Sequence, residues 1–329
     1  MKNKNTFLFI AGLGFAVLFL WLALKDADPQ RIALALSNAD WAYAIPFLVV
    51  LGMFYWLKAY RWALLLRPLA PVRAGTVFPA IMIGFAGNIF LPAQLGELIR
   101  TYVLGNQLKL RKSAVLSSIL LERVFDFLTI LIILGITLVV ERNLPEILVR
   151  GGYAIGGISA MLLVFVIIYA HWTRPLLSLL AAVTRFLPAR LHASLLDQLE
   201  TAAGGLAAIK DYRLMLMLML SSLLQWGLLG ICILVSIAAF HIQVPLSGAF
   251  LVLALMVATL TLPNTPGYFG PIQLAFTLAL KPFGIDPASA FAASMFYHVL
   301  AYFSVLIAGF YYTRQLGLTF KRLSRESGR

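Results

Sequence analysis

Ionisable side chains interrupt two segments of the sequence that are otherwise long and apolar. Glu97 and Arg100 are three residues apart, so they would share one face of a helix. Glu122, Arg123 and Asp126 lie about three helical turns into the apolar run that begins at residue 113. Ionisable groups at membrane depth cost about 2.5–3.5 kcal/mol each, so they pair with one another or line water. We therefore treat these five residues as the first candidates for function.

Two interpretations of these charges stay open at this point. Three acids against two bases leave one negative charge, which Arg61, Lys58 or a bound proton could neutralise. Glu122 and Asp126 share a helix face, and Arg123 can reach Asp126. The set could be a structural ion-pair network that clamps two helices together. It could also bind a lipid headgroup or carry a proton, and both roles can coexist.

Glycine and proline break the hydrophobic sequence at two related places. The spacing Leu-Pro-x-x-x-Gly at residues 91–96 recurs at residues 262–267. Lipid offers no water to a broken backbone, so such a segment must be buried in protein or line a wet cavity. Paired breaks in the two halves of one chain are the best sequence indication of a transport site.

Each break is expected to be the tip of a re-entrant hairpin, with a second half-helix beginning near Gln94 and near residues 265–267. Its free backbone N–H groups and positive dipole end would suit an anion such as a lipid phosphate. Polar side chains near the tips would either add donors or merely satisfy the broken backbone, and His298 and Tyr302, one turn apart, could line the cavity. The candidate lipid-binding residues are Arg61, Asn88, Pro92, Gln94, Gly96, Glu97, Arg100, Glu122, Arg123, Asp126, Pro263, Asn264, Thr265, Pro266, Gly267, Gln273, His298 and Tyr302.

Composition places the whole chain, residues 1–329, in a single membrane domain. Its residues are 61% hydrophobic and 12% charged, whereas an ordinary soluble domain has about 25% charged residues. The net charge of +13 is scattered through short loops, a pattern typical of cytoplasmic loops and contact with anionic lipid rather than nucleic acid. Cys232 is the single cysteine and the four histidines are isolated, so we expect neither a metal site nor a cofactor.

The basic residues also predict a topology with both termini in the cytoplasm. The cluster at residues 109–112 stays inside only if residues 75–107 enter and return as a hairpin, and residues 246–281 form the matching hairpin from outside. The two hairpins and their flanking spans predict an inverted repeat of residues about 41–140 and 214–313. Residues 173–212 are interpreted as amphipathic helices on the cytoplasmic interface, and residues 25–40 as a short polar loop. The predicted all-α fold thus has about six full transmembrane helices, at residues 6–24, 41–66, 113–140, 151–171, 214–240 and 288–312.

Four motifs together resemble one known family. They are Arg61-Trp62 before a leucine run, Asn88-x-x-Leu-Pro-x-x-x-Gly-Glu97-x-x-Arg100, Glu122-Arg123-x-x-Asp126, and Leu-Pro-x-Thr-Pro-Gly-x-x-Gly270. The chain looks like the transmembrane region of lysylphosphatidylglycerol synthase and its stand-alone, flippase-like relatives. The resemblance implies a two-hairpin fold. It also implies translocation of lipids such as aminoacylated phosphatidylglycerol or polyprenyl- or hopanoid-type lipids.

Two departures from the family pattern modify these expectations. The synthases carry a soluble aminoacyl-transferase domain after the membrane region, whereas this sequence ends soon after its last span, so we expect no lipid synthesis. The family's second hairpin usually reads Pro-Gly-Gly-x-Gly with an acid three residues on. Here Tyr268 replaces a glycine and Gln273 stands where glutamate is expected. This weakens the case for an acid–base role of the second hairpin.

The leading functional hypothesis is a lipid flippase or scramblase of the bacterial inner membrane, with anionic or polyprenyl- or hopanoid-type membrane lipids as partners. The alternatives are a non-transporting accessory or scaffold protein of envelope lipid biogenesis and an enzyme acting on lipid phosphates. We expect the chain not to be an enzyme, because no nucleophile–base pair or metal cluster can be assembled and no Walker A pattern is present. A homo-oligomer or a lipid-synthesis partner is left open.

Overall fold

The computed structural model describes residues 2–90, 95–141, 211–260 and 266–318, with isolated positions between 146 and 184. Every regular element within these described ranges is a helix, which confirms the predicted all-α class. The predicted span at residues 151–171 and the predicted interfacial helices at residues 173–212 lie almost entirely outside the described residues.

Four of the described helices are long and apolar enough to cross a membrane, which makes the chain a multi-pass membrane protein. Apolar side chains such as Val49, Ile136 and Val139 are more than half exposed on these helices, as expected of surfaces that contact lipid. The four are α3 with the preceding turn η1 (Trp41–Tyr43 and Ala44–Leu66), α6 (Lys112–Val140), α10 (Tyr212–Ala238) and α13 (Pro287–Gln315).

Two further predictions concern the N-terminal segment. Helix α1 (Lys2–Leu24) is present where the first span is predicted, and its crossing of the membrane stays a prediction. The polar loop predicted for residues 25–40 is wrong, because Pro29–Ser37 form helix α2. Asp28 caps this helix by accepting a hydrogen bond from the Gln30 amide at 2.9 Å, and proline suits the first helical position.

The first Gly/Pro-interrupted segment forms two short helices, α4 (Ala74–Phe90) and α5 (Gly96–Leu108), which pack against each other. Each is shorter than the roughly 20 residues that a span needs. Their crossing depends on glycine, since a Cβ atom on Gly96 would lie only 1.9 Å from the Gly84 carbonyl oxygen. The side chain of Asn88 accepts a hydrogen bond from the Gly96 amide at 2.7 Å and so caps the start of α5.

The second interrupted segment forms α11 (Leu246–Leu260), the short 3-10 turn η5 (Pro266–Tyr268) and α12 (Pro271–Leu280). Helix α12 therefore begins several residues after the predicted start at residues 265–267. The chain turns at Gly267 and Gly270, whose φ angles of 66° and 97° favour glycine. A Cβ atom on Gly270 would also lie 2.8 Å from a backbone oxygen of α1, so α1 packs closely on this turn.

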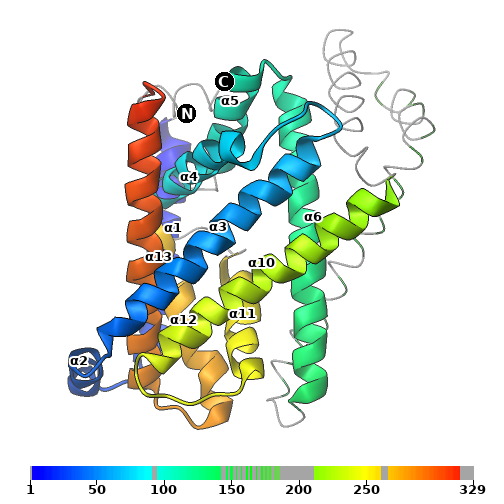
Figure 1. The fold of residues 1–329 in the computed structure, drawn as a ribbon. Helices are drawn as coiled ribbons and strands as arrows, with labels where there is room; N and C mark the ends of the chain where they lie inside the picture. Colours follow the sequence, from blue (N-terminus) through cyan, green and yellow to red (C-terminus); the bar gives the residue numbers. More distant parts are fainter. Residues whose placement is uncertain are drawn as a thin grey trace.

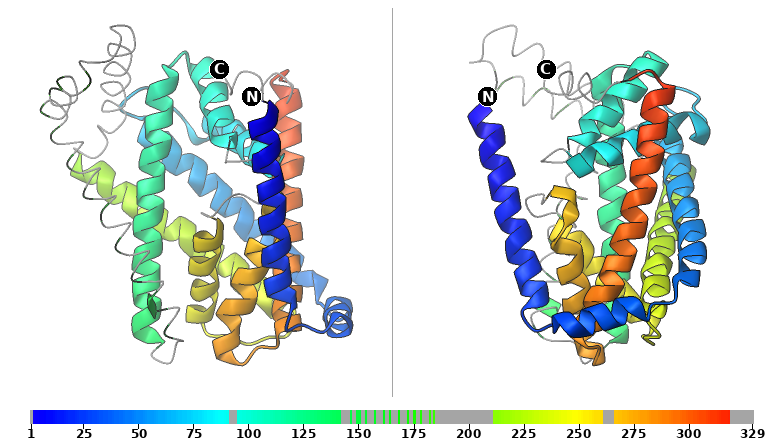
Figure 2. Two further views of the ribbon diagram at one scale, coloured as in Figure 1. Left: turned by 180° about the vertical axis from the view of Figure 1, so that it is seen from behind. Right: turned by 90° about the vertical axis from the view of Figure 1, so that its left-hand side faces the viewer.

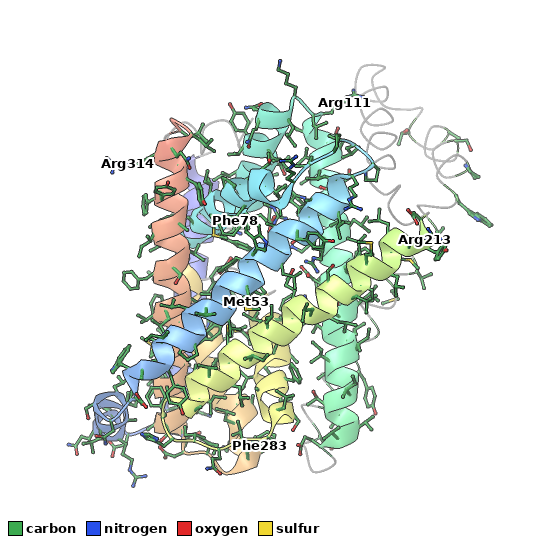
Figure 3. The ribbon with its side chains drawn as sticks, in the orientation of Figure 1. Met53, Phe78, Arg111, Arg213, Phe283 and Arg314 are labelled. Atoms are coloured by element: carbon green, nitrogen blue, oxygen red, sulfur yellow. The ribbon has the colours of Figure 1, made fainter. Side chains whose placement is uncertain are left out.

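The two pairs of short helices lie toward opposite ends of the long helices (Figures 1 and 2). The α4–α5 end also holds the start of α1 and the end of α13. Arg111 and Arg314 lie at this end, whereas Phe283, in the turn that follows α12, lies at the other (Figure 3). This arrangement is the one an inverted repeat would produce, but the six-span, two-hairpin topology and the repeat boundaries stay predictions.

Candidate functional site

Charged side chains from three helices meet in one largely buried network. Helix α3 contributes two cations, α5 an acid and a cation, and α6 two acids and a cation. The members are Lys58, Arg61, Glu97, Arg100, Glu122, Arg123 and Asp126.

Glu122 is the centre of this network and is 1% exposed. Its Oε1 lies 2.5 Å from Lys58 Nζ and accepts a hydrogen bond from Arg61 Nη2 at 3.2 Å. Its Oε2 accepts one from Arg100 Nη2 at 2.7 Å. One carboxylate on α6 thus connects α3 to α5, and charge-assisted bonds of this kind are roughly twice as strong as neutral ones.

Asp126 connects the network to α10. Its Oδ1 accepts hydrogen bonds from Arg61 Nη2 at 2.6 Å and from the Trp226 indole at 2.8 Å. Arg61 Nη1 in turn donates to the Ser222 hydroxyl at 2.6 Å. The shared helix face of Asp126 and Glu122 is confirmed, since both carboxylates contact Arg61.

Glu97 contacts two cations, Arg100 on its own helix and Arg123 on α6. Its Oε2 lies 3.0 Å from Arg100 Nη2, which confirms the predicted pair on one helix face. Arg123 donates to Glu97 Oε1. Arg123 is within reach of Asp126 along its own helix, but its side chain crosses to Glu97 on α5 instead.

The network carries a net positive charge. Four cations face three carboxylates, so the balance is +1 when all are ionised, whereas the α5 and α6 residues alone leave one negative charge. Lys58 and Arg61 both join the network, and together they change its net charge from −1 to +1. An excess buried charge is unfavourable unless a counter-charge reaches it, so the network suits an anion.

A cavity of about 230 Å³ borders the network and extends between the two halves of the chain. Its volume is below the roughly 300–1,000 Å³ of sites that enclose a drug-sized ligand, so it fits a headgroup and not a whole lipid. At its charged wall lie Lys58, Arg123, Asp126, Gln225 and Trp226. Its other walls are mostly apolar and aromatic, with Tyr55, Asn88, Tyr268, Tyr297, His298 and Tyr302 as their polar members.

His298 of α13 lines the cavity and forms two hydrogen bonds to the second interrupted segment. Its Nε2 lies 3.0 Å from the Gly267 carbonyl, which can only accept, so Nε2 carries the proton. Its Nδ1 accepts from Gln273 Nε2 at 3.0 Å, while Gln273 Oε1 accepts from the Gly270 amide at 2.8 Å. Gln273, like Asn88, therefore satisfies broken backbone, the alternative role considered from the sequence.

The remaining predicted site residues divide by position. Tyr302 lines the cavity, and its hydroxyl would lie 2.0 Å from a Cβ atom on Gly267, so these two residues pack tightly. Gly96 lies where α4 and α5 cross, and its lack of a side chain allows the two helices to approach closely. The hairpin-tip residues Pro92, Gln94, Pro263, Asn264 and Thr265, and the side chain of Pro266, lie outside the described residues.

Sequence reasoning missed the contribution of α10. Ser222, Gln225 and Trp226 are spaced at i, i+3 and i+4 in an otherwise apolar helix, so they share one face. Ser222 and Trp226 bond the network and Gln225 lines the cavity. This polar face on an apolar helix was the sequence feature that could have indicated the contribution of α10 to the site. Within the described part of the chain, no group of three His, Cys, Asp or Glu side chains could hold a metal ion.

The fold and site define a multi-pass helical membrane protein with a charged internal cavity. Residues 9–309 match the family described as the lysylphosphatidylglycerol synthase TM region, and the chain belongs to that family. Over 91% of its length it is 27% identical to a glycosyltransferase named AglD of Haloferax volcanii. Over 68% it is 26% identical to a UPF0104 membrane protein of Methanocaldococcus jannaschii. No solved structure matches it.

These comparisons correct one prediction. The expectation that the chain is not an enzyme is contradicted, because a relative that aligns over 91% of the chain carries the name of a glycosyltransferase. The chain spans 53% of the length of that relative and 90% of the length of the UPF0104 protein.

Proposed function

We propose that this protein moves a phosphate-bearing or amphiphilic envelope lipid between the leaflets of the bacterial inner membrane. The observation that carries the proposal is the net positive, buried network that borders a largely apolar cavity. A lipid phosphate would supply the missing negative charge, and the apolar and aromatic walls would accept the adjoining part of the amphiphile.

The headgroup would occupy the cavity while the acyl or prenyl chains stay in the surrounding lipid. Lys58 and Arg123 are the two cations of the network that line the cavity, and Arg123 is the more exposed, with 38% of its side chain accessible. Rocking of the two halves of the chain around the cavity would open it to one leaflet and then to the other. The basic residues at the α4–α5 end, such as Arg111 and Arg314, favour an orientation with that end on the cytoplasmic side.

The test is lipid translocation by purified protein in liposomes. Vesicles carry a fluorescent phospholipid in both leaflets, and an impermeant reductant quenches only the outer one. We expect the wild-type protein to expose the inner lipid and the variant Lys58→Met to slow this by roughly ten-fold or more, the factor that about 1.4 kcal/mol of lost binding gives. Arg314→Gln, which alters an exposed residue at the end of α13, is the matched control. Quenching by wild type no faster than in protein-free vesicles would contradict the proposal.

The name of the Haloferax relative favours a second candidate, glycosyl transfer involving a lipid. Asp126 is the carboxylate that lines the cavity, and its Oδ2 accepts no hydrogen bond. A carboxylate in this position could deprotonate an acceptor hydroxyl. Purified protein incubated with a radiolabelled nucleotide sugar and membrane lipid would yield a labelled lipid, and Asp126→Asn would abolish it. No labelled lipid from wild type would exclude this candidate.

A further inference from the structure

Gln225 is a buried polar side chain that has no hydrogen-bond partner among the residues that the structure describes. It is 0% exposed, and neither its amide nitrogen nor its amide oxygen has a partner. Both atoms of a buried amide normally bond, because leaving them unpaired is unfavourable. Gln225 lines the same cavity as Lys58, Arg123 and Asp126, so the cavity is where a partner can be found.

Gln273, a fully buried glutamine that bonds the cavity-lining His298, shows what a structural role looks like. Gln273 is also 0% exposed, but its Oε1 bonds the Gly270 amide and its Nε2 bonds His298. A glutamine that braces the fold has both ends occupied by protein. Gln225 has neither end occupied, which points to a ligand that enters the cavity.

The groups around Gln225 define what that ligand must offer. The amide presents an NH2 donor group and an acceptor oxygen, and Oδ2 of Asp126, which accepts no hydrogen bond, presents a second acceptor. A phosphodiester can only accept hydrogen bonds, so it suits Lys58 and Arg123 but leaves both acceptors unmatched. A hydroxyl both donates and accepts, and it can bond the amide nitrogen and either oxygen.

We propose that Gln225 determines headgroup specificity, and that the cavity selects an anionic phosphodiester lipid whose headgroup carries a hydroxyl, as glycerol and sugar headgroups do. The single negative charge of the phosphodiester balances the +1 charge of the network. The hydroxyl bonds Gln225 and Asp126. Hydrogen bonds hold the face of α10 that carries Gln225 against the network, because Ser222 bonds Arg61 and Trp226 bonds Asp126. This inference rests on the proposed assignment of the cavity to a lipid headgroup.

The test compares two short-chain lipids that differ only in the two hydroxyls of the headgroup. Dihexanoyl phosphatidylglycerol and dihexanoyl phosphatidylpropanol both carry one negative charge, and their affinities for the purified full chain are measured by calorimetry. We expect the wild-type protein to bind phosphatidylglycerol about ten-fold more tightly, because the analogue leaves buried polar groups unpaired. The isosteric variant Gln225→Met should bind both lipids equally.

Two controls separate a binding role from a structural one. Gln225→Met removes no hydrogen bond from the unliganded protein and should unfold at or above the wild-type temperature, whereas Gln273→Met, which loses two bonds, should unfold at a lower one. Gln225→Glu adds a negative charge that cancels the net charge of the network, so it should weaken the binding of both anionic lipids to the same extent.

The outcomes for specificity and for transport are distinguishable. Equal affinity of wild type for the two lipids, or a preference retained by Gln225→Met, would overturn the role of Gln225. Wild-type protein that translocates lipid without preferring the hydroxyl would contradict this inference alone. Wild-type protein that prefers phosphatidylglycerol in binding and yet translocates nothing would contradict the proposed transport and leave the specificity intact.

Discussion

Arg100 of α5 donates a hydrogen bond from Nη2 to Oε2 of Glu122 on α6 at 2.7 Å. Both residues are almost completely buried, and the Arg100 guanidinium also stacks 4.4 Å from the Trp62 ring centroid. This contact fastens the first pair of short helices to a long apolar helix. Trp62 is part of the core, because it is 0% exposed and its indole donates a hydrogen bond to the Ser118 hydroxyl.

Replacing Arg100 with methionine should strongly destabilise the protein. The change leaves Glu97 and Glu122 with one fewer cation in a buried setting, and breaking a buried pair in this way costs about 3–5 kcal/mol. Thermal unfolding in detergent measures the loss. Arg150→Gln is the control, because its ion pair with Glu146 is 76% exposed on both sides and should contribute at most about 1 kcal/mol. Equal unfolding temperatures for the two variants would show that the buried network is not what holds α5 in place.

Gly96→Ala should separate α4 from α5. The added methyl group would lie 1.9 Å from the Gly84 carbonyl and 2.5 Å from the Asn88 side chain, and overpacking of this kind costs about 1–3 kcal/mol. Gly52→Ala in α3 is the matched control, since nothing lies within 4 Å of its added methyl and alanine favours a helix by about 0.5–1 kcal/mol. Unfolding temperatures should therefore move in opposite directions. A Gly96→Ala protein as stable as wild type would rule out the close crossing.

The sequence alone allowed the long helices, both pairs of short helices and the α5–α6 charges to be predicted, because hydrophobic length and helical spacing determine them locally. The participation of both Lys58 and Arg61 could not be predicted, because it depends on how α3 packs against α6. The same holds for Arg123, whose partner Glu97 is 26 residues away in the chain. Gln225 was overlooked for a different reason, since the polar face that it shares with Ser222 and Trp226 is visible in the sequence but its lack of hydrogen-bond partners is seen only in the structure.

The predicted inverted arrangement of the two short-helix pairs can be tested by labelling single cysteines. Arg73→Cys, just before α4, and Lys281→Cys, just after α12, introduce exposed thiols near opposite ends of the molecule. The native Cys232 is 0% exposed and should stay unlabelled. In right-side-out membrane vesicles, an impermeant maleimide should label position 281 at once and position 73 only after the vesicles are opened. Labelling of both positions from the same side would contradict the inverted repeat.

The central claim is that the excess positive charge beside the cavity binds a lipid phosphate, and native mass spectrometry of the purified protein tests it most directly. We predict that wild type and the surface variant Arg314→Gln each retain one phosphate-bearing lipid, and that Lys58→Met, whose network is neutral, loses it. A wild-type protein that retains no such lipid, or a Lys58→Met protein that retains as much as wild type, would contradict the account.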